Sequence, residues 1–254
     1  MKKLLVVLVT MFMCFSLVGC SSNEEETTQA SVWSDQLKQE GKLIVGISPD
    51  YPPFENLTTD GVIEGFDAEV AKYIADKLGL ELEFAQIEFD NIVTAVQTGQ
   101  VDIGISAFTY DADRDVIFTK SYVESGQAVL VAKDSGIKTT ADLKDKTIGG
   151  QTGTTGLDAA GEIEGTKEVT PFVDAMIGLA SVGSTIDAFV SDYGVVKAYA
   201  DANGLAVLDE LLLSEEMSAI IKNGNDLLAE KVNEAITEFI ASEKYEALRI
   251  EWGI

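Results

Sequence analysis

Two short stretches of the chain follow the same pattern, and this repeat restricts the possible folds more than any other feature of the sequence. Residues 90–99 read DNIVTAVQTG and residues 174–183 read DAMIGLASVG, so both carry Asp, two apolar pairs and a final Gly at matching positions. An apolar segment ending in Ser follows each stretch, VDIGIS at 101–106 and IDAFVS at 186–191. The pattern predicts a helix that begins at Asp and stops at Gly, followed by a strand. Two lobes of similar construction are therefore expected, with chance matching of two ordinary helix–strand units as the alternative.

The sequence before the first repeat alternates strand and helix patterns. KLIVGI at 42–47 is a short apolar run rich in branched residues, which is typical of a buried strand. Apolar residues then recur every four positions from Phe66 to Leu78 and predict a helix, which we expect Asp67 to cap, before the strand-like LELEFAQI at 80–87. A strand–helix–strand order favours a parallel sheet and therefore an α/β fold.

The chain is expected to pass between the two lobes twice. Extended crossings are predicted near 126–132 and 216–222, where apolar, strand-like segments separate the repeated units. The first lobe then comprises 33–125 together with 221–254, and the second lobe comprises 126–220. Two crossings make a hinge, and ligands of such folds bind in the cleft that the carboxyl ends of the strands face.

The N-terminus has the pattern of an export signal. Residues 1–19 begin with two lysines and continue into a short apolar run, which is too short for a membrane span and is typical of a signal peptide. The ending Leu-Val-Gly-Cys resembles a bacterial lipobox, which implies a lipid on Cys20; a buried structural cysteine is the alternative. Residues 20–32 are almost entirely polar and are expected to form a flexible tether.

The composition excludes several classes of function. The chain carries 43 acidic residues against 18 basic ones, a formal net charge of −25, so neither nucleic acid nor anionic lipid is expected as a partner. Histidine is absent and no free thiol is expected in the mature chain, which excludes the usual His-dependent nucleophiles and most catalytic zinc sites. Asp111, Asp113 and Asp115 resemble the start of a calcium loop, but Val116 and Tyr122 replace the Gly and Glu that such a loop needs. We therefore expect no metal, no cofactor and no enzymatic activity.

The stretch SAFTYDADR is the strongest candidate for a binding site in the first lobe. It follows the strand 101–106, and it carries Arg114, one of only two arginines in the chain. A guanidinium beside Thr109 and backbone amides suits a carboxylate, and we expect a short helix to carry it. The alternative is a solvated Arg114 that pairs with a neighbouring aspartate on the surface.

The second lobe offers a complementary set of groups. The loop QTGTTG leads from a strand into a helix, so Thr154 and Thr155 place hydroxyls and backbone N–H groups where an anion can bind. The loop lacks the lysine and the length of a phosphate-binding P-loop. Asp192 ends the strand-like IDAFVSD and is expected to face the same cleft, with a helix N-cap as its alternative role. Together these groups suit a ligand that carries both a carboxylate and an ammonium.

Taken in order, these motifs resemble the extracellular solute-binding proteins (family 3) of polar amino acid ABC importers. The resemblance rests on the lipobox, YPPFE at 51–55, GFDAEVAKYIADKLG at 65–79, the run ending in Arg114, GQTGTTG at 150–156, IDAFVSD and the C-terminal helical segment, and it covers essentially the whole mature chain. It implies a type II periplasmic-binding-protein-like fold, with two α/β lobes joined by a two-strand hinge. It also implies the ligand-binding residues Tyr51, Phe54, Phe89, Ser106, Ala107, Thr109, Arg114, Gln151, Thr154, Thr155 and Asp192.

The resemblance also implies a role for each group. Arg114 and Thr109 would hold the α-carboxylate of an amino acid, helped by Thr154 or Thr155. Asp192 and the Ala107 carbonyl would take the α-ammonium, while Tyr51 and Phe89 enclose the side chain and Phe54 serves equally well as a core residue.

Arg249 lies in a helical pattern far from the strand ends, and no lysine stands in the motifs that face the ligand. A neutral polar ligand of glutamine-like size is therefore expected ahead of arginine, lysine or histidine, and acidic amino acids are disfavoured. The protein would be a monomer on the outer face of the membrane that delivers its ligand to a permease and ATPase. A dehydratase-type enzyme or an extracellular sensory module on the same scaffold are the alternatives.

Overall fold

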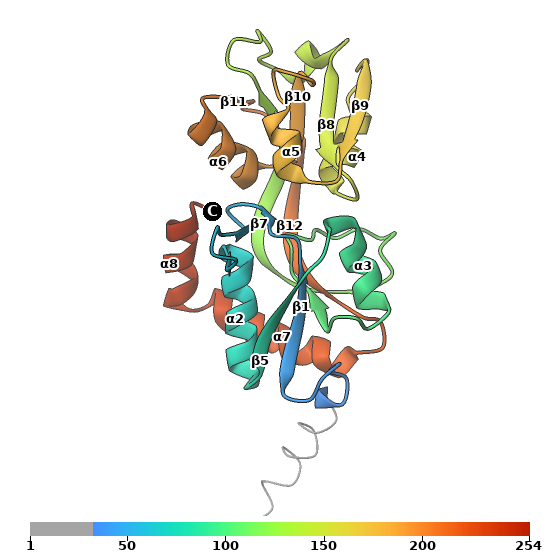
Figure 1. Ribbon diagram of the computed structural model, residues 1–254, viewed down its shortest axis with the longest axis vertical. Helices are drawn as coiled ribbons and strands as arrows, with labels where there is room; N and C mark the ends of the chain where they lie inside the picture. Colours follow the sequence, from blue (N-terminus) through green and yellow to red (C-terminus); the bar gives the residue numbers. More distant parts are fainter. Residues whose placement is uncertain (1–32) are drawn as a thin grey trace, which may run out of the picture.

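The computed structural model describes residues 33–254 of the chain (Figure 1). The predicted signal peptide, the lipidation site Cys20 and the tether up to residue 32 lie outside the described residues. No helix within 33–254 combines the length and the apolar character that a membrane crossing requires.

The elements alternate between strand and helix along the chain, as an α/β fold requires. In the first half they are β1 (Lys42–Ile47), β2 (Asp50–Tyr51), β3 (Glu55–Leu57), β4 (Ile63–Glu64), α2 (Phe66–Leu78), β5 (Glu81–Gln86), α3 (Phe89–Gln97), β6 (Ile103–Gly104) and β7 (Ile117–Val131). In the second half they are the 3-10 helix Thr140–Leu143, β8 (Thr147–Gln151), α4 (Thr155–Glu162), β9 (Glu168–Phe172), α5 (Ala175–Ala180), β10 (Ala188–Asp192), α6 (Tyr193–Asn203), β11 (Ala206–Val207), β12 (Leu213–Ile221), α7 (Asp226–Ile240) and α8 (Glu243–Trp252).

The strand order explains the repeat in the sequence. The main sheet has the strand order β5-β1-β6-β12-β7-β10-β8-β9. Each end of the sheet carries three parallel strands, and the middle strand of each trio, β1 or β8, is the one that comes first in the sequence. The innermost strand of each trio is β6 in the first lobe and β10 in the second. Each of these strands follows the helix of the repeat, α3 or α5, along the chain. The two repeated units are therefore equivalent parts of two similar lobes.

Strands β7 and β12 connect the lobes. They pair antiparallel at the centre of the sheet and run from one lobe into the other (Figure 1). Their ladder is irregular, with register shifts between Met217 and Ser218 and between Ser218 and Ile220. The expected arrangement of two α/β lobes joined by two strands is confirmed, while the residue limits given above for each lobe stay a prediction.

Helices cover the sheet on both faces and close the core of each lobe. In the first lobe α2 and α8 lie on one side of β1 and α3 on the other (Figure 1), while α7 packs against α2 and β7. Helix α2 buries its apolar stripe, including Phe66 and Ile74, which are both fully buried, and ends at Gly79 in the left-handed conformation. Helix α5 begins as predicted, because the Asp174 side chain accepts a hydrogen bond from Ile177 N.

Two of the expected helix starts are wrong. Asp67 does not cap α2, because the capping position is Gly65 and the Asp67 side chain points into the core, where it is completely buried. Helix α3 begins one residue before Asp90, with Glu88 at the capping position and no side-chain cap. At α2 the Asp67 carboxyl accepts a hydrogen bond from Ala107 N in the core instead of capping the helix. At α3 the helix starts at the residue before Asp90, so Asp90 lies inside its first turn.

Candidate functional site

A cavity with an empty volume of about 310 Å³ lies between the two lobes. Its walls are formed by Asp50, Tyr51, Glu55, Phe89, Ser106, Ala107, Thr109, Arg114, Gln151, Thr154, Thr155 and Asp192. All the residues proposed from the sequence therefore line one cavity, with the exception of Phe54. Within 33–254 no cluster of three or more potential metal ligands occurs.

The fold places these residues together because they follow the carboxyl ends of parallel strands. Ser106 to Thr109 come after β6, Gln151 is the last residue of β8, and Asp192 is the last residue of β10. Tyr51 ends β2, in the loop that follows β1. The cavity therefore lies at the sheet edge where ligands of open α/β folds bind.

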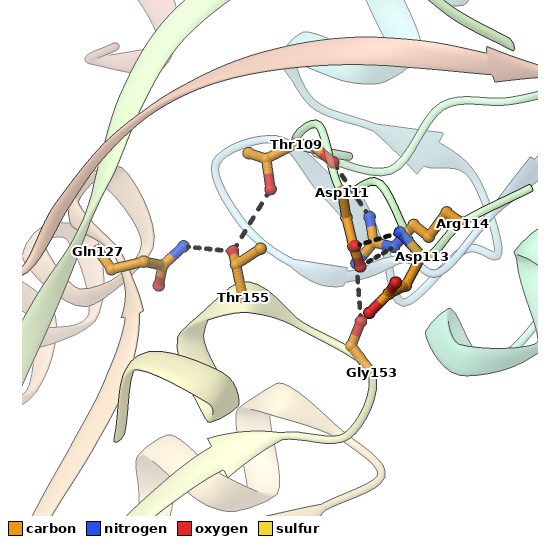
Figure 2. Close-up of polar contacts among 7 residues, drawn as sticks. All are labelled: Thr109, Asp111, Asp113, Arg114, Gln127, Gly153 and Thr155. Carbon is orange, nitrogen blue, oxygen red and sulfur yellow. Dashed lines mark hydrogen bonds and ion pairs between the residues drawn. The ribbon is translucent and has the colours of Figure 1, made fainter. Parts of the chain in front are cut away.

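Arg114 lies at the boundary between the lobes, in a turn rather than in the short helix that was expected (Figure 2). Its Nη1 donates to Thr109 O at 3.2 Å, and its Nη2 donates to Gly153 O of the second lobe at 2.8 Å. Phe89 and Phe108 stack on each other beside the guanidinium, with ring centroids 5.7 and 5.2 Å from Cζ. Arg114 does pair with Asp111, at 3.4 Å, but only 9% of its side chain is exposed, so it is not a solvated surface pair.

The threonines of the second lobe have two different roles. Thr154 is the N-cap of α4, because its hydroxyl accepts from Leu157 N at 3.2 Å and donates to Gln151 O at 2.7 Å. The Thr155 hydroxyl instead reaches the cavity, 3.3 Å from the Thr109 hydroxyl of the first lobe. Figure 2 shows this contact together with the amide of Gln127, which donates to Thr155 at 3.3 Å. Arg114, Thr109 and Thr155 are thus connected by hydrogen bonds and line the same cavity.

Asp192 lies on the other side of the cavity and is 4% exposed. Although it occupies the N-cap position of α6, its side chain makes no capping bond. Its two oxygens accept from Ser125 Oγ at 2.7 Å and from Tyr51 OH at 2.8 Å. Burial raises the pKa of Asp192 to about 6, opposed by these hydrogen bonds. A cation placed beside this carboxylate would stabilise its charged form.

The aromatic residues divide into lining and supporting side chains. Tyr51 and Phe89 both line the cavity, and Tyr51 also crosses the cleft through its hydroxyl, 2.5 Å from Ser191 Oγ. Phe54 is 1% exposed and stacks behind Tyr51 with ring centroids 6.3 Å apart. It packs as a core residue and reaches the cavity only through Tyr51.

Two acidic residues of the cavity wall were missing from the residues proposed for the site. Asp50 belongs to the first lobe, and its Oδ2 accepts from Gln151 Nε2 at 3.0 Å and from Ala175 N at 2.9 Å, both in the second lobe. Burial raises the pKa of Asp50. Glu55 is fully buried and accepts from Ser106 Oγ at 2.6 Å. Their position beside Tyr51, in the loop after a strand that ends at the cleft, is the sequence feature that could have identified them.

These features define a class of protein. Two α/β lobes joined by two strands, with one small polar cavity between them whose walls come from both lobes, are the architecture of a solute-binding protein that closes around its ligand. The chain belongs to the bacterial extracellular solute-binding proteins, family 3, whose sequence profile matches residues 43–254. It is therefore an extracellular binding protein rather than an enzyme.

Individual relatives agree with this assignment over the whole chain. The arginine-binding extracellular protein ArtP of Bacillus subtilis is 30% identical over 262 residues, which covers 99% of this chain and 98% of ArtP. The crystal structure of the P235GK mutant of ArgBP from T. maritima has a TM-score of 0.81 and 34% sequence identity, and covers 87% of this chain and 98% of that one. An ancestral arginine-binding protein, solved with arginine and with glutamine, gives a TM-score of 0.78 in both states, at 33% and 32% identity over 84% of this chain and 98% of that one. The type II periplasmic-binding-protein fold expected from the sequence is confirmed.

Proposed function

We propose that this chain is the substrate-binding component of an amino acid ABC importer, which captures a free amino acid and delivers it to a permease and its ATPase. The observation that carries the proposal is the separation of charge across the cavity. Arg114 of the first lobe and Asp192 of the second lobe are both largely buried at its walls. An α-amino acid carries the two complementary charges at a fixed separation.

The same separation gives the ligand a reason to close the lobes. Arg114, Thr109 and Thr155 would hold the α-carboxylate, while Asp192 and the Ala107 carbonyl would hold the α-ammonium. A ligand shifts a conformational equilibrium only by as much as it prefers one state over the other. An amino acid held by Arg114 in one lobe and Asp192 in the other makes both contacts only when the lobes are closed, so binding favours closure.

For the side chain of the ligand we propose a neutral polar group of glutamine-like size. Among the described residues, Arg114 is the one basic residue on the cavity wall, and the α-carboxylate of the ligand would occupy it, so an acidic side chain would lack a partner. Both oxygens of Asp50 already accept hydrogen bonds, from Ser48 on one side and from Gln151 and Ala175 on the other. A neutral amide can use the remaining polar groups without displacing these donors.

Arginine is the second candidate, and one observation favours it. Asp50 is a carboxylate on the cavity wall with no basic side chain among its hydrogen-bond partners. A guanidinium near it would balance that charge. The ancestral relative solved with both arginine and glutamine has the same fold, so one scaffold of this kind accepts either ligand.

A thermal-shift screen of the purified protein against the common amino acids tests the proposal, because a ligand that binds only the folded state raises the melting temperature. Calorimetric competition between glutamine, arginine and glutamate then ranks the side chains. We expect glutamine to bind most tightly and glutamate not to compete. Tightest binding by glutamate would overturn the assignment of Arg114 to the α-carboxylate, and no shift with any amino acid would overturn the ligand class.

We further propose that a lipid on Cys20 anchors the protein to the outer face of the cell membrane. The lipobox-like sequence before Cys20 supports this. Replacing Cys20→Ser should release the protein from the membrane fraction into the medium and abolish incorporation of a labelled fatty acid. Permease and ATPase genes beside this one would favour the importer over a sensory module.

A further inference from the structure

Two carboxyl groups lie buried next to one another behind the cavity wall. Glu55 begins β3 and Asp67 lies in the first turn of α2, and neither has any exposed surface. Their hydrogen-bond donors, Ser106 Oγ and Ala107 N, belong to consecutive residues, and the two carboxyls act on each other's pKa. Both lie outside the groups that would touch the α-carboxylate and α-ammonium of the ligand, although Glu55 forms part of the wall.

Each carboxyl has one oxygen that is engaged and one that is not. Glu55 Oε1 accepts from Ser106 Oγ at 2.6 Å, and Asp67 Oδ2 accepts from Ala107 N at 2.6 Å and from Tyr122 OH at 2.8 Å. Glu55 Oε2 and Asp67 Oδ1 are buried and have no donor. Two buried oxygens without a donor are costly, and a single O–H···O bond between them would satisfy both.

Within 33–254, none of the groups with the largest effects on the pair is a cation that could neutralise two negative charges. The charged groups that act on the pair are the carboxyls of Asp50 and Asp192, and the tyrosine beside it is Tyr122. Burial is the largest effect on both carboxyls, and it raises the pKa of Glu55 and of Asp67. Like-charged carboxyls in one dry site cannot both ionise at neutral pH.

We propose that Glu55 and Asp67 share one proton, and that the bonded pair is a positioning device for the Ser106–Ala107 backbone of the binding site. Ala107 has φ 51°, a left-handed conformation that is unfavourable for a residue other than glycine. Its N–H donates to Asp67, while Glu55 holds the preceding Ser106. The pair therefore fixes the positions of Ser106 and Ala107, which both line the cavity.

The consequence for binding rests on the proposed function. If the Ala107 carbonyl receives the ammonium of an amino acid, its direction depends on the left-handed Ala107 conformation that Asp67 stabilises. The pair then acts on affinity through Ala107, without contact between Asp67 and the ligand. It also makes the folded protein bind a proton that the unfolded chain releases at neutral pH.

That proton has a defined effect on stability. An acid whose pKa is raised on folding contributes stability that is complete below its unfolded pKa and is lost as pH rises through the folded pKa. The wild type should therefore release about one proton from this pair on unfolding at neutral pH. Replacing Glu55→Gln removes this release while the amide still donates to Asp67 and accepts from Ser106.

The decisive experiment compares Glu55→Gln and Glu55→Ala with the wild type. Infrared difference spectra between wild type and Glu55→Gln at neutral pH should contain the C=O stretch of a neutral carboxylic acid, and any contribution from Asp192 cancels in the difference. Relative to Glu55→Gln, Glu55→Ala, which leaves Ser106 Oγ and the Asp67 carboxyl without this partner, should bind the ligand more than about tenfold more weakly. Absence of the carboxylic acid band, or a loss in Glu55→Gln equal to that in Glu55→Ala, would overturn the proposal.

The infrared and proton-release measurements need no ligand. If the wild type binds no amino acid, the proposed function fails, but the band and the proton count still decide whether the pair shares a proton. If Glu55→Ala does not fold, Glu55→Gln and the wild type remain a sufficient comparison.

Discussion

Asp50 provides the sharpest test of how the two lobes hold together. The replacement Asp50→Ala removes a carboxylate that accepts two hydrogen bonds from the second lobe, from Gln151 Nε2 at 3.0 Å and from Ala175 N at 2.9 Å. All three groups are free to bind water when the lobes separate. The change should therefore destabilise the closed state and leave each lobe intact.

The structure sets the size of the effect. Hydrogen bonds to a charged group are worth about 1.5 to 3 kcal/mol each. Burial raises the pKa of Asp50, which shows that closure also removes this carboxylate from water at a cost. The two opposing contributions leave a net loss of about 1 to 2 kcal/mol, or about 5- to 30-fold in affinity.

The assay is calorimetric titration with every amino acid that the wild type binds. The closed fraction scales all apparent affinities alike, so Asp50→Ala should weaken glutamine and arginine by the same factor. Asp60→Ala removes the same charge from an exposed loop of the same lobe and should leave affinity unchanged. An unchanged affinity in Asp50→Ala would refute the closure argument, and a loss confined to arginine would show that Asp50 contacts the ligand side chain instead.

Three further predictions follow from the site and the fold. Arg114→Ala should abolish amino acid binding in a folded protein, because a buried carboxylate without its partner costs about 3 to 5 kcal/mol; near-normal titration would return Arg114 to a structural role. Affinity should fall about tenfold per pH unit below about 6, the raised pKa of Asp192, because protonation removes the charge that the ammonium needs; a flat profile between pH 5 and 7 would contradict this. Gly65→Ala should lower the free energy of unfolding by more than about 3 kcal/mol, since Gly65 has φ 123° and an added Cβ would lie 2.2 Å from Phe54 O, whereas Gly161→Ala in α4, with open space around it, should be neutral or stabilising in the same denaturation assay.

The sequence predicted the parts of the site that follow from sheet topology. Asp192 ends β10 and Arg114 lies in the segment between β6 and β7, and the rule that parallel strands present their carboxyl ends at one edge predicted that both line one cavity. The repeat predicted the two lobes because each helix–strand unit occupies an equivalent place in its own half of the sheet.

The residues that were missed depend on contacts between distant parts of the chain. Asp50 meets Ala175, which is 125 residues away, and Asp67 meets Ala107, which is 40 residues away. Nothing in the local pattern distinguishes Asp67 from an ordinary helix-capping aspartate, so it was expected to cap the helix. Periodicity and capping preferences describe neighbours along the chain, and they carry no information about which backbone N–H a buried carboxylate will find.

The irregular ladder between β7 and β12 has a mechanical consequence. Because both strands are shared by the two lobes within one continuous sheet, the lobes cannot separate as independent bodies, and any opening must twist this pair. A regular ladder resists torsion, whereas the offsets around Ser218 leave a stretch with fewer backbone bonds to distort. The amide hydrogens of this stretch should then exchange with solvent in step with opening, and slow down when ligand keeps the lobes shut.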